Sequence, residues 1–461
     1  MTALPEQPLS PLDGRYRSAV SGLSEQLSEG ALNRARVRVE VEWLLYLTNH
    51  SLFGSSPLPE EKVRALRALV SDFGQDDIAQ LARLEATTRH DVKAVEYFVR
   101  AKLTALDLDA ISELTHFGCT SEDINNLAYA LTIGAAVREV WLPKLHRVID
   151  ALHERAVTHR ATAMLAHTHG QPATPTTVGK EFAVFVARLR RLAVQVEATE
   201  YWGKFSGATG TFAAQMAADP TQDWATISQE FVSSLGLMWN PLTTQIEPHD
   251  WQAELYSKVS HTNRVLHNLC TDIWAYISMG YFTQIPPAGS TGSSTMPHKI
   301  NPIRFENAEA NLELSSAILE LLAQTLVTSR LQRDLTDSTT QRNVGVGFGH
   351  SLLAMDNILR GLPELAVNLP KLDADLDANW EVLGEAIQTV IRAEVAAGRS
   401  SITDPYAMLK ELTRGKHVGR QELAAFVSGL DIGADAKARL LALTPAGYVG
   451  LASDLVEYAA K

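Results

Sequence analysis

Long stretches of helical character, separated by short polar segments, constrain the fold of this chain more than any other feature. They cover residues 121–163, 177–203, 250–282 and 303–328. Each is far longer than the average protein helix of ~11 residues, and patterns typical of strands are nearly absent. Several long helices without strands indicate a helix bundle, so the sequence predicts an all-α fold. Pro143 lacks the amide hydrogen that its turn requires, which predicts a kink in the first of these helices.

Residues 33–50 are the most ambiguous stretch. Their valines occupy alternate positions, as in a strand. Oppositely charged residues stand four positions apart, Arg36 with Glu40 and Arg38 with Glu42, and such pairs meet on the surface of a helix. We therefore predict a helix here.

Changes in composition near residues 107–109 and 363–370, where short helical segments replace long ones, indicate domain boundaries. They divide the chain into an N-terminal helical domain (1–110), a central long-helix bundle (111–364) and a C-terminal helical domain (365–461). The length of 461 residues agrees, because it exceeds that of one usual hydrophobic core.

The long helices also predict self-association. The segment 273–279 carries apolar residues on more than one face. A single packing neighbour cannot cover such a helix, so further copies of the chain are expected to do so.

The charge of the chain limits its partners. A net charge of −12 argues against binding to nucleic acid or to an acidic membrane, since phosphate groups require a cationic surface. A small anionic ligand would need a local basic pocket. No apolar run approaches the ~20 residues that cross a bilayer, so no membrane span is expected.

The N-terminus and the cysteines indicate the compartment. The first residues lack the basic start and apolar core of a secretory signal, so we expect a cytoplasmic location. Cys119 and Cys270 are the only cysteines, too few for a disulfide framework or a thiolate metal site. We interpret both as small buried apolar residues.

Residues 288–302 form the most unusual segment, because they open with eight small or hydroxyl-bearing residues, 288–295. This run is longer than a connection between two helices requires, so we interpret it as a lid over a binding site; a flexible surface loop is the alternative. Asn301 and Pro302 suit the N-cap and first turn of the next helix. Lys299 and the free N–H groups of that helix would then face an anion.

A polar turn at residues 167–175 joins two of the predicted long helices and contains His167 and His169. An imidazole transfers protons near neutral pH, which favours a catalytic role. A His-x-His pair also binds zinc in some proteins, but no acidic or thiol residue follows at a helical ligand spacing, and we predict no metal site. A structural role stays open for one of the two histidines.

Residues 120–123, Thr-Ser-Glu-Asp, are typical of a capping box, in which Thr120 caps a helix and Asp123 reaches back to it. Hydroxyl and amide groups then gather at the positive end of the helix, where they either bind a ligand or serve as an ordinary cap. Other polar clusters would be solvated surface if alone, but together they supply local cations. These clusters are residues 13–16, 89–93, 245–249 and 333–342.

Several motifs carry a resemblance to a known family. Residues 292–301, Gly-Ser-Ser-Thr-Met-Pro-His-Lys-Ile-Asn, resemble the signature loop of the fumarase/aspartase superfamily. Motifs along essentially the whole chain resemble those of the adenylosuccinate lyase family of bacterial purine synthesis. They are residues 10–16, 87–97, 120–126, 168–175, 243–250 and 333–338. The resemblance implies a three-domain all-α subunit, a homotetramer with a central bundle of long helices, and active sites that each draw on three subunits.

The resemblance also implies a reaction without metal or other cofactor. Fumarate would be eliminated from adenylosuccinate, giving AMP, and from the succinylcarboxamide ribonucleotide SAICAR, giving AICAR. Both substrates carry a phosphate and two carboxylates, which fits a local basic pocket. The nearest alternative is a sister lyase acting on argininosuccinate or malate, and the flanking motifs favour adenylosuccinate. A catalytically inactive helical scaffold and a zinc hydrolase built on the two histidines are alternatives from other classes.

By their positions in the family motifs, five residues are assigned to the chemistry of elimination. Ser293 would remove the Cβ proton, and His169 would protonate the departing nitrogen. A serine hydroxyl is a weak base, so Ser293 must lie in a closed, desolvated site near the positive charge of Lys299. Lys299 and Asn301 would stabilise the negative charge that develops on the substrate carboxylate. Glu306 would orient the acid histidine.

The resemblance assigns a larger set of residues to contacts with the substrate, and among them His90 is also a candidate for catalysis. The set comprises Arg15, Tyr16, Arg89, His90, Asp91, Thr120, Ser121, Thr168, Gln245, Lys299, Asn301, Arg333, Ser338 and Arg342. Three positions depart from the family pattern: His167 stands where arginine is common, Arg89 where asparagine occurs, and Arg304 where an acidic or small residue is usual. The departures concern binding detail, because each residue assigned to proton transfer is present.

Overall fold

The computed structural model describes residues 8–286, 296, 299–413 and 418–460. The chain divides into two compact units. Unit 1 comprises Met1–Leu145, Leu192–Arg264 and Ala310–Asp356, and unit 2 comprises His146–Arg191, Val265–Glu309 and Asn357–Lys461. The division into three domains that the sequence suggests stays a prediction.

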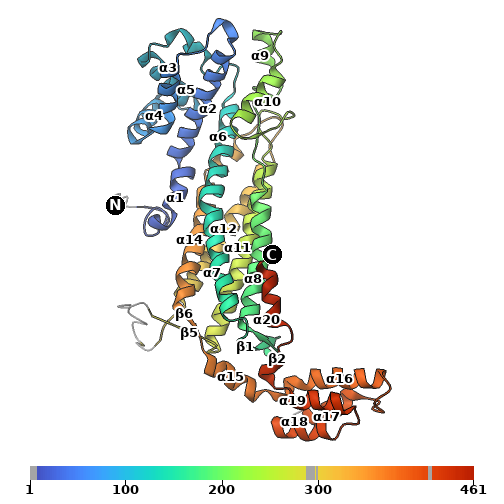
Figure 1. Ribbon diagram of the computed structural model, residues 1–461. Coiled ribbons are helices and arrows are strands. Elements are labelled where there is room, and N and C mark those ends of the chain that lie inside the picture. Colours follow the sequence, from blue (N-terminus) through green and yellow to red (C-terminus); the bar gives the residue numbers. More distant parts are fainter. Residues whose placement is uncertain (1–7, 287–295, 297–298, 414–417, 461) are drawn as a thin grey trace. The chain divides into compact units, whose positions relative to one another are not determined.

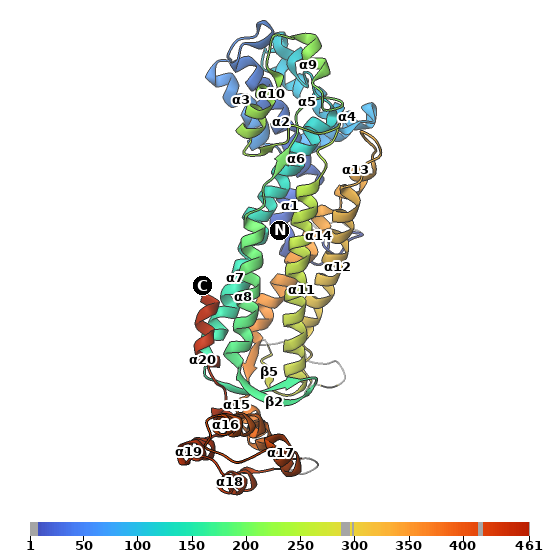
Figure 2. The same cartoon turned by 90° about the vertical axis from the view of Figure 1, so that its right-hand side faces the viewer.

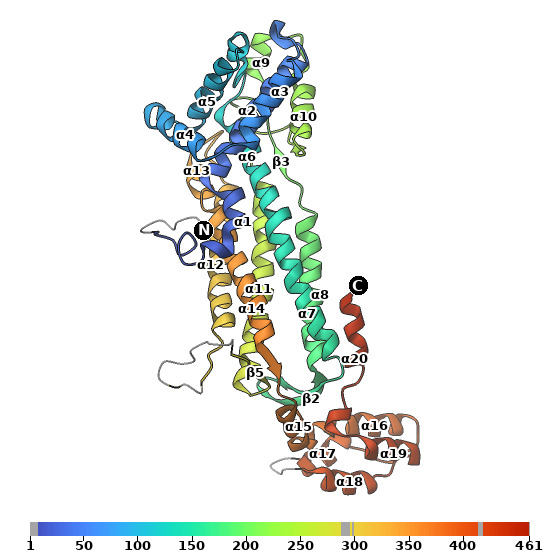
Figure 3. The ribbon, with the colours of Figure 1, turned by 60° about the vertical axis from the view of Figure 1, so that its left-hand side comes forward.

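Unit 1 consists mainly of helices, and Figure 3 shows those that precede residue 240 in blue, cyan and green. Its helical elements are α1 (Arg17–Leu27), α2 (Glu29–Asn49), η1 (Leu52–Gly54), α3 (Glu60–Ser71), α4 (Gln75–Thr88), α5 (Asp91–Ala105), η2 (Asp109–Leu114), α6 (Ser121–Ala135), η3 (Ala136–Trp141), α9 (Ala213–Ala218), α10 (Trp224–Ser234) and α13 (Thr336–Gln341). Its short strands β3 (Trp202–Gly203) and β4 (Met238–Trp239) form one parallel pair.

Unit 2 combines short strands with a C-terminal group of helices. Its strands are β1 (Ala163–Thr168), β2 (Gln171–Thr177), β5 (Phe282–Gln284) and β6 (Leu365–Val367). Its helical elements are η4 (Leu362–Glu364), α15 (Leu369–Ala378), η5 (Trp380–Leu383), α16 (Gly384–Ala396), α17 (Pro405–Thr413), α18 (Arg420–Ser428), α19 (Ala434–Ala442), η6 (Pro445–Gly447), α20 (Ala452–Leu455) and η7 (Val456–Ala460). Helices α16 to α19 gather around a shared apolar core that includes Ile387, Ile391, Leu423 and Leu440 (Figure 2).

The remaining long helices include residues of both units. They are α7 (Leu142–Thr158), α8 (Val178–Glu197), α11 (Asp250–Ser278), α12 (Ile303–Leu326) and α14 (Val344–Gly361). The all-α fold class is therefore confirmed, although the predicted helices extend too far at their C-terminal ends. None of the described helices combines the length and the apolar character needed to cross a membrane.

The irregularity predicted at Pro143 takes the form of a π-helical segment, η3, directly before it. The Leu142 N–H donates to the carbonyl of Val137, five residues earlier, rather than to the usual carbonyl four residues earlier. Pro143 has no N–H to continue the regular ladder and its ring crowds the preceding turn, so one wider turn accommodates it. Helical structure thus continues from α6 into α7.

Helix α2 confirms the helix predicted for residues 33–50, but the ion pairs that suggested it do not form. Arg36 contacts Asp91 of α5 at 2.7 Å, whereas Glu40 contacts His116 at 2.6 Å. Both side chains point into the protein because α2 packs against α5 and α6, as Figure 1 shows for α2 and α6. Burial on several faces also explains the alternating valines, which are fully buried.

The pair of Glu40 and His116 predicts a pH-dependent contribution to stability. Burial lowers the pKa of His116, but the hydrogen bond and charge of Glu40 outweigh it, and the pKa is raised overall. The pair therefore stabilises the fold fully below the unfolded-state pKa of 6.5 and less as pH rises through the higher folded-state pKa. Urea unfolding measures the free energy of unfolding of the wild type and of His116→Gln. The wild type should exceed the variant by more at about pH 6 than at about pH 9. An equal difference in free energy at the two pH values would contradict this.

The polar segment 167–175 was predicted to be a turn between helices. In the structure it belongs to a β-hairpin, which β1 and β2 form in unit 2 (Figure 1). Thr168 pairs with Gln171, which leaves His169 and Gly170 as a two-residue loop. Both loop residues have positive φ, 55° and 72°, as a type I′ turn requires. Glycine adopts this conformation freely, whereas a histidine there is strained by roughly 1–2 kcal/mol.

Candidate active site

Two helix N-termini in unit 1 bring predicted site residues together. His90 is the N-cap of α5, and its Nδ1 accepts a hydrogen bond from the Lys93 N–H at 3.3 Å. In the neutral imidazole the proton is then on Nε2, which lies 3.4 Å from the Ser121 hydroxyl at the start of α6. An exposed imidazole N–H and a hydroxyl group are thus available at two positive helix ends.

Asp91 links this pair to two arginines. Its carboxylate lies 2.7 Å from Arg36 and 3.2 Å from Arg342. Burial raises the pKa of Asp91, but the charges of Arg36 and Arg342, with the N–H of Val92, outweigh it and lower the pKa overall. Asp91 is therefore ionised at neutral pH and fixes the position of Arg342.

Arg342 follows α13 and is tied to Ser338 of that helix. Its Nη1 donates to the Ser338 carbonyl at 2.8 Å and to the Ser338 hydroxyl at 2.9 Å. A cavity of about 280 Å³ lies beside Arg342, and its wall includes Ser10 and Asp13 of the N-terminal motif. The N-terminal motif 10–16 and the segment 333–342 therefore both line this cavity of unit 1.

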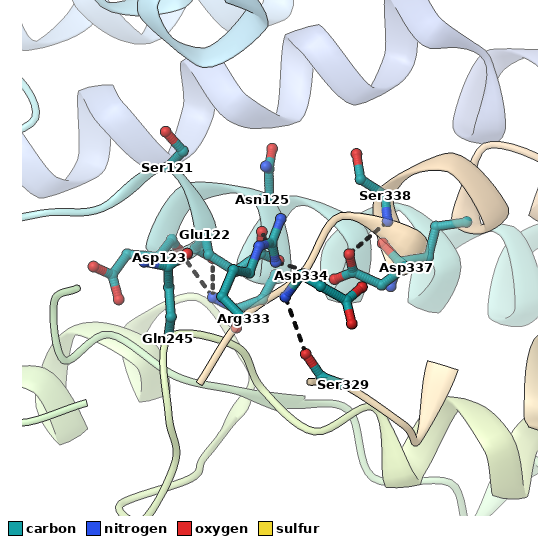
Figure 4. Close-up of polar contacts among 12 residues, drawn as sticks. Ser121, Glu122, Asp123, Asn125, Gln245, Ser329, Arg333, Asp334, Asp337 and Ser338 are labelled. Carbon is teal, nitrogen blue, oxygen red and sulfur yellow. Dashed lines mark hydrogen bonds and ion pairs between the residues drawn. The ribbon is translucent and has the colours of Figure 1, made fainter. Parts of the chain in front are cut away.

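Arg333 lies between two buried carboxylates. Its Nη1 is 2.9 Å from Glu122 of α6 and 3.0 Å from Asp337 of α13, and Figure 4 shows the contact with Glu122. Burial raises the pKa of Glu122, and the charge of Arg333 opposes that rise. The guanidinium is held in one orientation because both carboxylates approach the same nitrogen.

The N-terminus of α6 is fixed by a buried ion pair. Asp123 accepts the Thr120 N–H at 2.8 Å, which confirms the reach-back contact of the predicted capping box. The same carboxylate contacts Lys204 at 2.8 Å and accepts the N–H groups of Ser206 and Gly207. Asp123 is saturated by these contacts, so its role is to hold Thr120 and its neighbours rather than to bind a ligand.

Four other predicted residues of unit 1 lie apart from these contacts. Gln245 is partly buried and donates to the Ala208 carbonyl at 3.0 Å. The Arg15 guanidinium lies 5.7 Å from the ring of Tyr16, which is the N-cap of α1. Arg89 ends α4 with a φ of 51°.

The predicted catalytic residues of unit 2 lie in two places. His169 and Thr168 are exposed at the tip of the β1–β2 hairpin. Lys299 donates to the Asn301 side-chain oxygen at 2.7 Å just before α12. Helix α12 begins at Ile303, the first residue of the predicted segment 303–328, and the Pro302 carbonyl, not that of Asn301, accepts the Glu306 N–H. Ser293 lies outside the described residues.

Glu306 is not hydrogen-bonded to His169 within the described part of the chain. Its carboxylate accepts from the Trp274 Nε1 at 3.2 Å. Arg304, one of the departures from the family pattern, pairs with Glu364 at 3.4 Å. His167, another departure, has its ring 5.9 Å from that of Tyr281.

No group of three or more His, Cys, Asp or Glu side chains in the described ranges could hold a metal ion. Sequence reasoning missed Lys204 altogether. It named Arg36 and the polar clusters that contain Glu122, His249 and Asp337, but it did not predict the buried contacts by which these residues hold the site. The sequence did contain one signal for these contacts, because Lys204 is a charged residue inside an apolar run. It indicates a buried ion pair but does not identify the partner.

Two family models match the chain. One, described as lyase, covers residues 14–314, and the other, described as adenylosuccinate lyase C-terminal, covers residues 329–449. The adenylosuccinate lyase of Escherichia coli strain K12 is 48% identical over 451 residues, which are 97% of this chain and 98% of that one. The chain belongs to the adenylosuccinate lyase family. A second member of the family, from Haemophilus influenzae, is 47% identical over the same shares of the two chains. This family consists of lyases, so the chain is an enzyme of that class.

Solved structures show the same fold. A fumarate lyase from Mesorhizobium sp. BNC1 has a TM-score of 0.73 at 18% identity and covers 95% of this chain and 97% of its own. The 3-carboxy-cis,cis-muconate lactonizing enzyme of Pseudomonas putida has a TM-score of 0.71 at 20% identity, with 95% and 96% covered. At these identities the likeness concerns the fold alone, which is that of the fumarase/aspartase superfamily.

Proposed function

We propose that this chain releases fumarate from adenylosuccinate, giving AMP, and from SAICAR, giving AICAR, in cytoplasmic purine nucleotide synthesis. The observation that carries the proposal is the 48% identity to an adenylosuccinate lyase over nearly the full length of both chains. A cytoplasmic location is consistent with Cys119 and Cys270, which are both free thiols.

The electrostatics of unit 1 support a substrate with several negative charges. An acidic protein that binds such a molecule needs fixed local cations and hydrogen-bond donors. Arg342 and Arg333 are each fixed by carboxylates and lie in the same segment as Ser338. His90 and Ser121 add hydrogen-bonding groups at helix N-termini, where anions are favoured. We assign these residues, with Arg15, Tyr16, Arg89, Asp91, Thr120 and Gln245, to substrate contacts.

The proposed elimination is a proton transfer at each end of a carbon–carbon–nitrogen unit. Ser293 takes the Cβ proton, and the electron pair of that C–H bond forms the new double bond of fumarate. The C–N bond breaks, its electron pair stays on the departing nitrogen, and His169 gives that nitrogen a proton. Lys299 and Asn301, already in contact with each other, stabilise the carboxylate on which negative charge develops. Thr168 precedes His169 in the hairpin and contacts the substrate.

A homotetramer would complete the site. Glu306 is bound to Trp274 in the isolated chain, so we propose that the histidine it orients belongs to another copy. Exposed apolar residues on the long helices, among them Trp274, Leu314 and Leu321, support burial against further subunits.

The substrate assignment is tested by following fumarate formation with purified protein. Adenylosuccinate and SAICAR should both yield fumarate, whereas argininosuccinate and malate should be inert. The wild type should also keep full activity after exhaustive chelation, because the proposed proton transfers use side chains alone. If the protein converts argininosuccinate but not adenylosuccinate, the chain has the sister lyase activity instead. If chelation abolishes activity and zinc restores it, the zinc hydrolase is favoured.

A further inference from the structure

A buried polar network in unit 1 lies behind the arginines assigned to the substrate. His249 is 1% exposed, and its Nε2 lies 3.4 Å from Asp337. Asp337 contacts Arg333 at 3.0 Å and accepts the Ser338 N–H at 2.7 Å. One buried histidine is therefore connected, through a single carboxylate, to both Arg333 and Ser338.

The orientation of the imidazole follows from its other neighbours. Nδ1 faces the side-chain NH2 groups of Gln252 at 3.3 Å and Gln341 at 3.2 Å. Amide NH2 groups donate, so Nδ1 is the acceptor and the proton of the neutral ring is on Nε2. The Nε2–H therefore points at Asp337. Tyr256 extends the network by donating to the Gln252 oxygen at 3.1 Å.

The hydrogen bond from His249 helps to keep the Asp337 carboxylate charged. Burial raises the pKa of Asp337, but the hydrogen bond from His249 and the charge of Arg333 outweigh it, so the pKa is lowered overall. The carboxylate stays ionised in a buried position, where a charge needs fixed donors to remain. Without His249, Asp337 would lose the one donor from outside its own segment, residues 329–342, that the described part of the chain supplies.

The backbone at His249 is also held in a costly conformation. Its φ is 63°, in the left-handed region, and its N–H donates to the Glu247 carboxylate at 2.8 Å. Glu247 lies two residues after Gln245, which is assigned to the substrate. Strain of this kind persists where surrounding contacts determine one geometry.

We propose that His249 is a positioning residue, which acts through Asp337 to fix Arg333 and Ser338 in the orientation that binds the substrate anions. This rests on the proposed function for the identity of those anions. His249 itself touches neither the substrate nor the reacting atoms. It couples the loop that carries Gln245 to the segment that carries the arginines.

The matched variants His249→Gln and His249→Asn test this. Glutamine places an amide N–H near the position of Nε2 and reaches Asp337, whereas asparagine is too short, although it tolerates the left-handed backbone. His249→Asn should raise the KM for adenylosuccinate about ten- to a hundredfold with kcat changed less than about threefold, and His249→Gln should recover most of that loss. A purely structural role predicts no such split between KM and kcat and no advantage of glutamine over asparagine.

A second measurement does not depend on the substrate. Amide hydrogen exchange of the free protein should be faster over residues 333–342 in His249→Asn than in His249→Gln, with α6 unchanged. If the wild type does not act on adenylosuccinate, the proposed function fails and the exchange result still decides this inference. Equal exchange and equal KM in the two variants would overturn it.

A milder change covers the case in which His249→Asn does not fold. Gln341→Leu removes one of the two donors to Nδ1 and leaves the imidazole in place. It should raise KM about two- to tenfold at unchanged kcat, because the imidazole is less firmly oriented. An unchanged KM in a folded Gln341→Leu protein would count against the network as a positioning device.

Discussion

His169→Asn should lower kcat for fumarate release by about 10²- to 10⁴-fold, the range that one general acid or base contributes. Asparagine is the informative substitution because it accepts the positive φ of the hairpin loop but carries no proton to give. Ser293→Ala should cause a loss of similar size. Stopped assays of fumarate with saturating adenylosuccinate measure both, and far-ultraviolet circular dichroism should be unchanged because His169 is exposed.

The matched control for this prediction is His50→Asn, a substitution of an exposed histidine at the end of α2 in unit 1, which should keep wild-type kcat. Mixed assemblies sharpen the test. If one active site draws His169 and Ser293 from different copies, subunits of the two inactive variants should regain activity when they are reassembled together. A His169→Asn protein with near-normal kcat would disprove the assignment of the acid.

Sequence patterns predicted the long helices because their cause is local. Caps and helical periodicity stand close together along the chain, as Thr120 and Asp123 do at the start of α6. Pro143 likewise marked the place of an irregular turn, and the missing N–H explains it. The end of the first long helix was placed too late because residues 163–168 pair with a second strand, and that pairing was not read from the pattern.

The hairpin that carries His169 was missed for a related reason. His-Gly is a weaker signal for a type I′ turn than Asn-Gly, and the β-branched threonines after it were taken as part of a turn between helices. The family resemblance singled out His169, but it gave no reason why the side chain is exposed. The two-residue loop supplies that reason, since it places the imidazole at the tip of the hairpin.

Ion pairs were the least predictable feature of the site. Arg36 and Glu40 have ideal helical spacing, yet each pairs with a residue far away in sequence. Spacing predicts pairs only on a solvated face, whereas α2 is covered by its neighbours and its charged groups must find buried partners. The same limit hid the contact between His249 and Asp337, which are 88 positions apart in the sequence.

Lys204→Met should destabilise the protein by about 3–5 kcal/mol, the usual result of leaving a buried charge without its partner. Both Lys204 and Asp123 are essentially fully buried, and the Lys204 Nζ also donates to the Gly207 carbonyl at 2.7 Å. Methionine fills similar space but satisfies neither oxygen. The midpoint of urea unfolding, followed by circular dichroism, measures the loss.

The control Lys258→Met makes the same substitution at a partly exposed site in unit 1, where the partner Glu254 is 3.9 Å away and largely exposed. It should change stability by less than about 0.5 kcal/mol. Asp123 also accepts the Thr120 N–H, so the Lys204 variant should loosen the start of α6, and KM should rise in whatever folded protein remains. If the two variants unfold at the same urea concentration, the buried pair is not what holds this helix end in place.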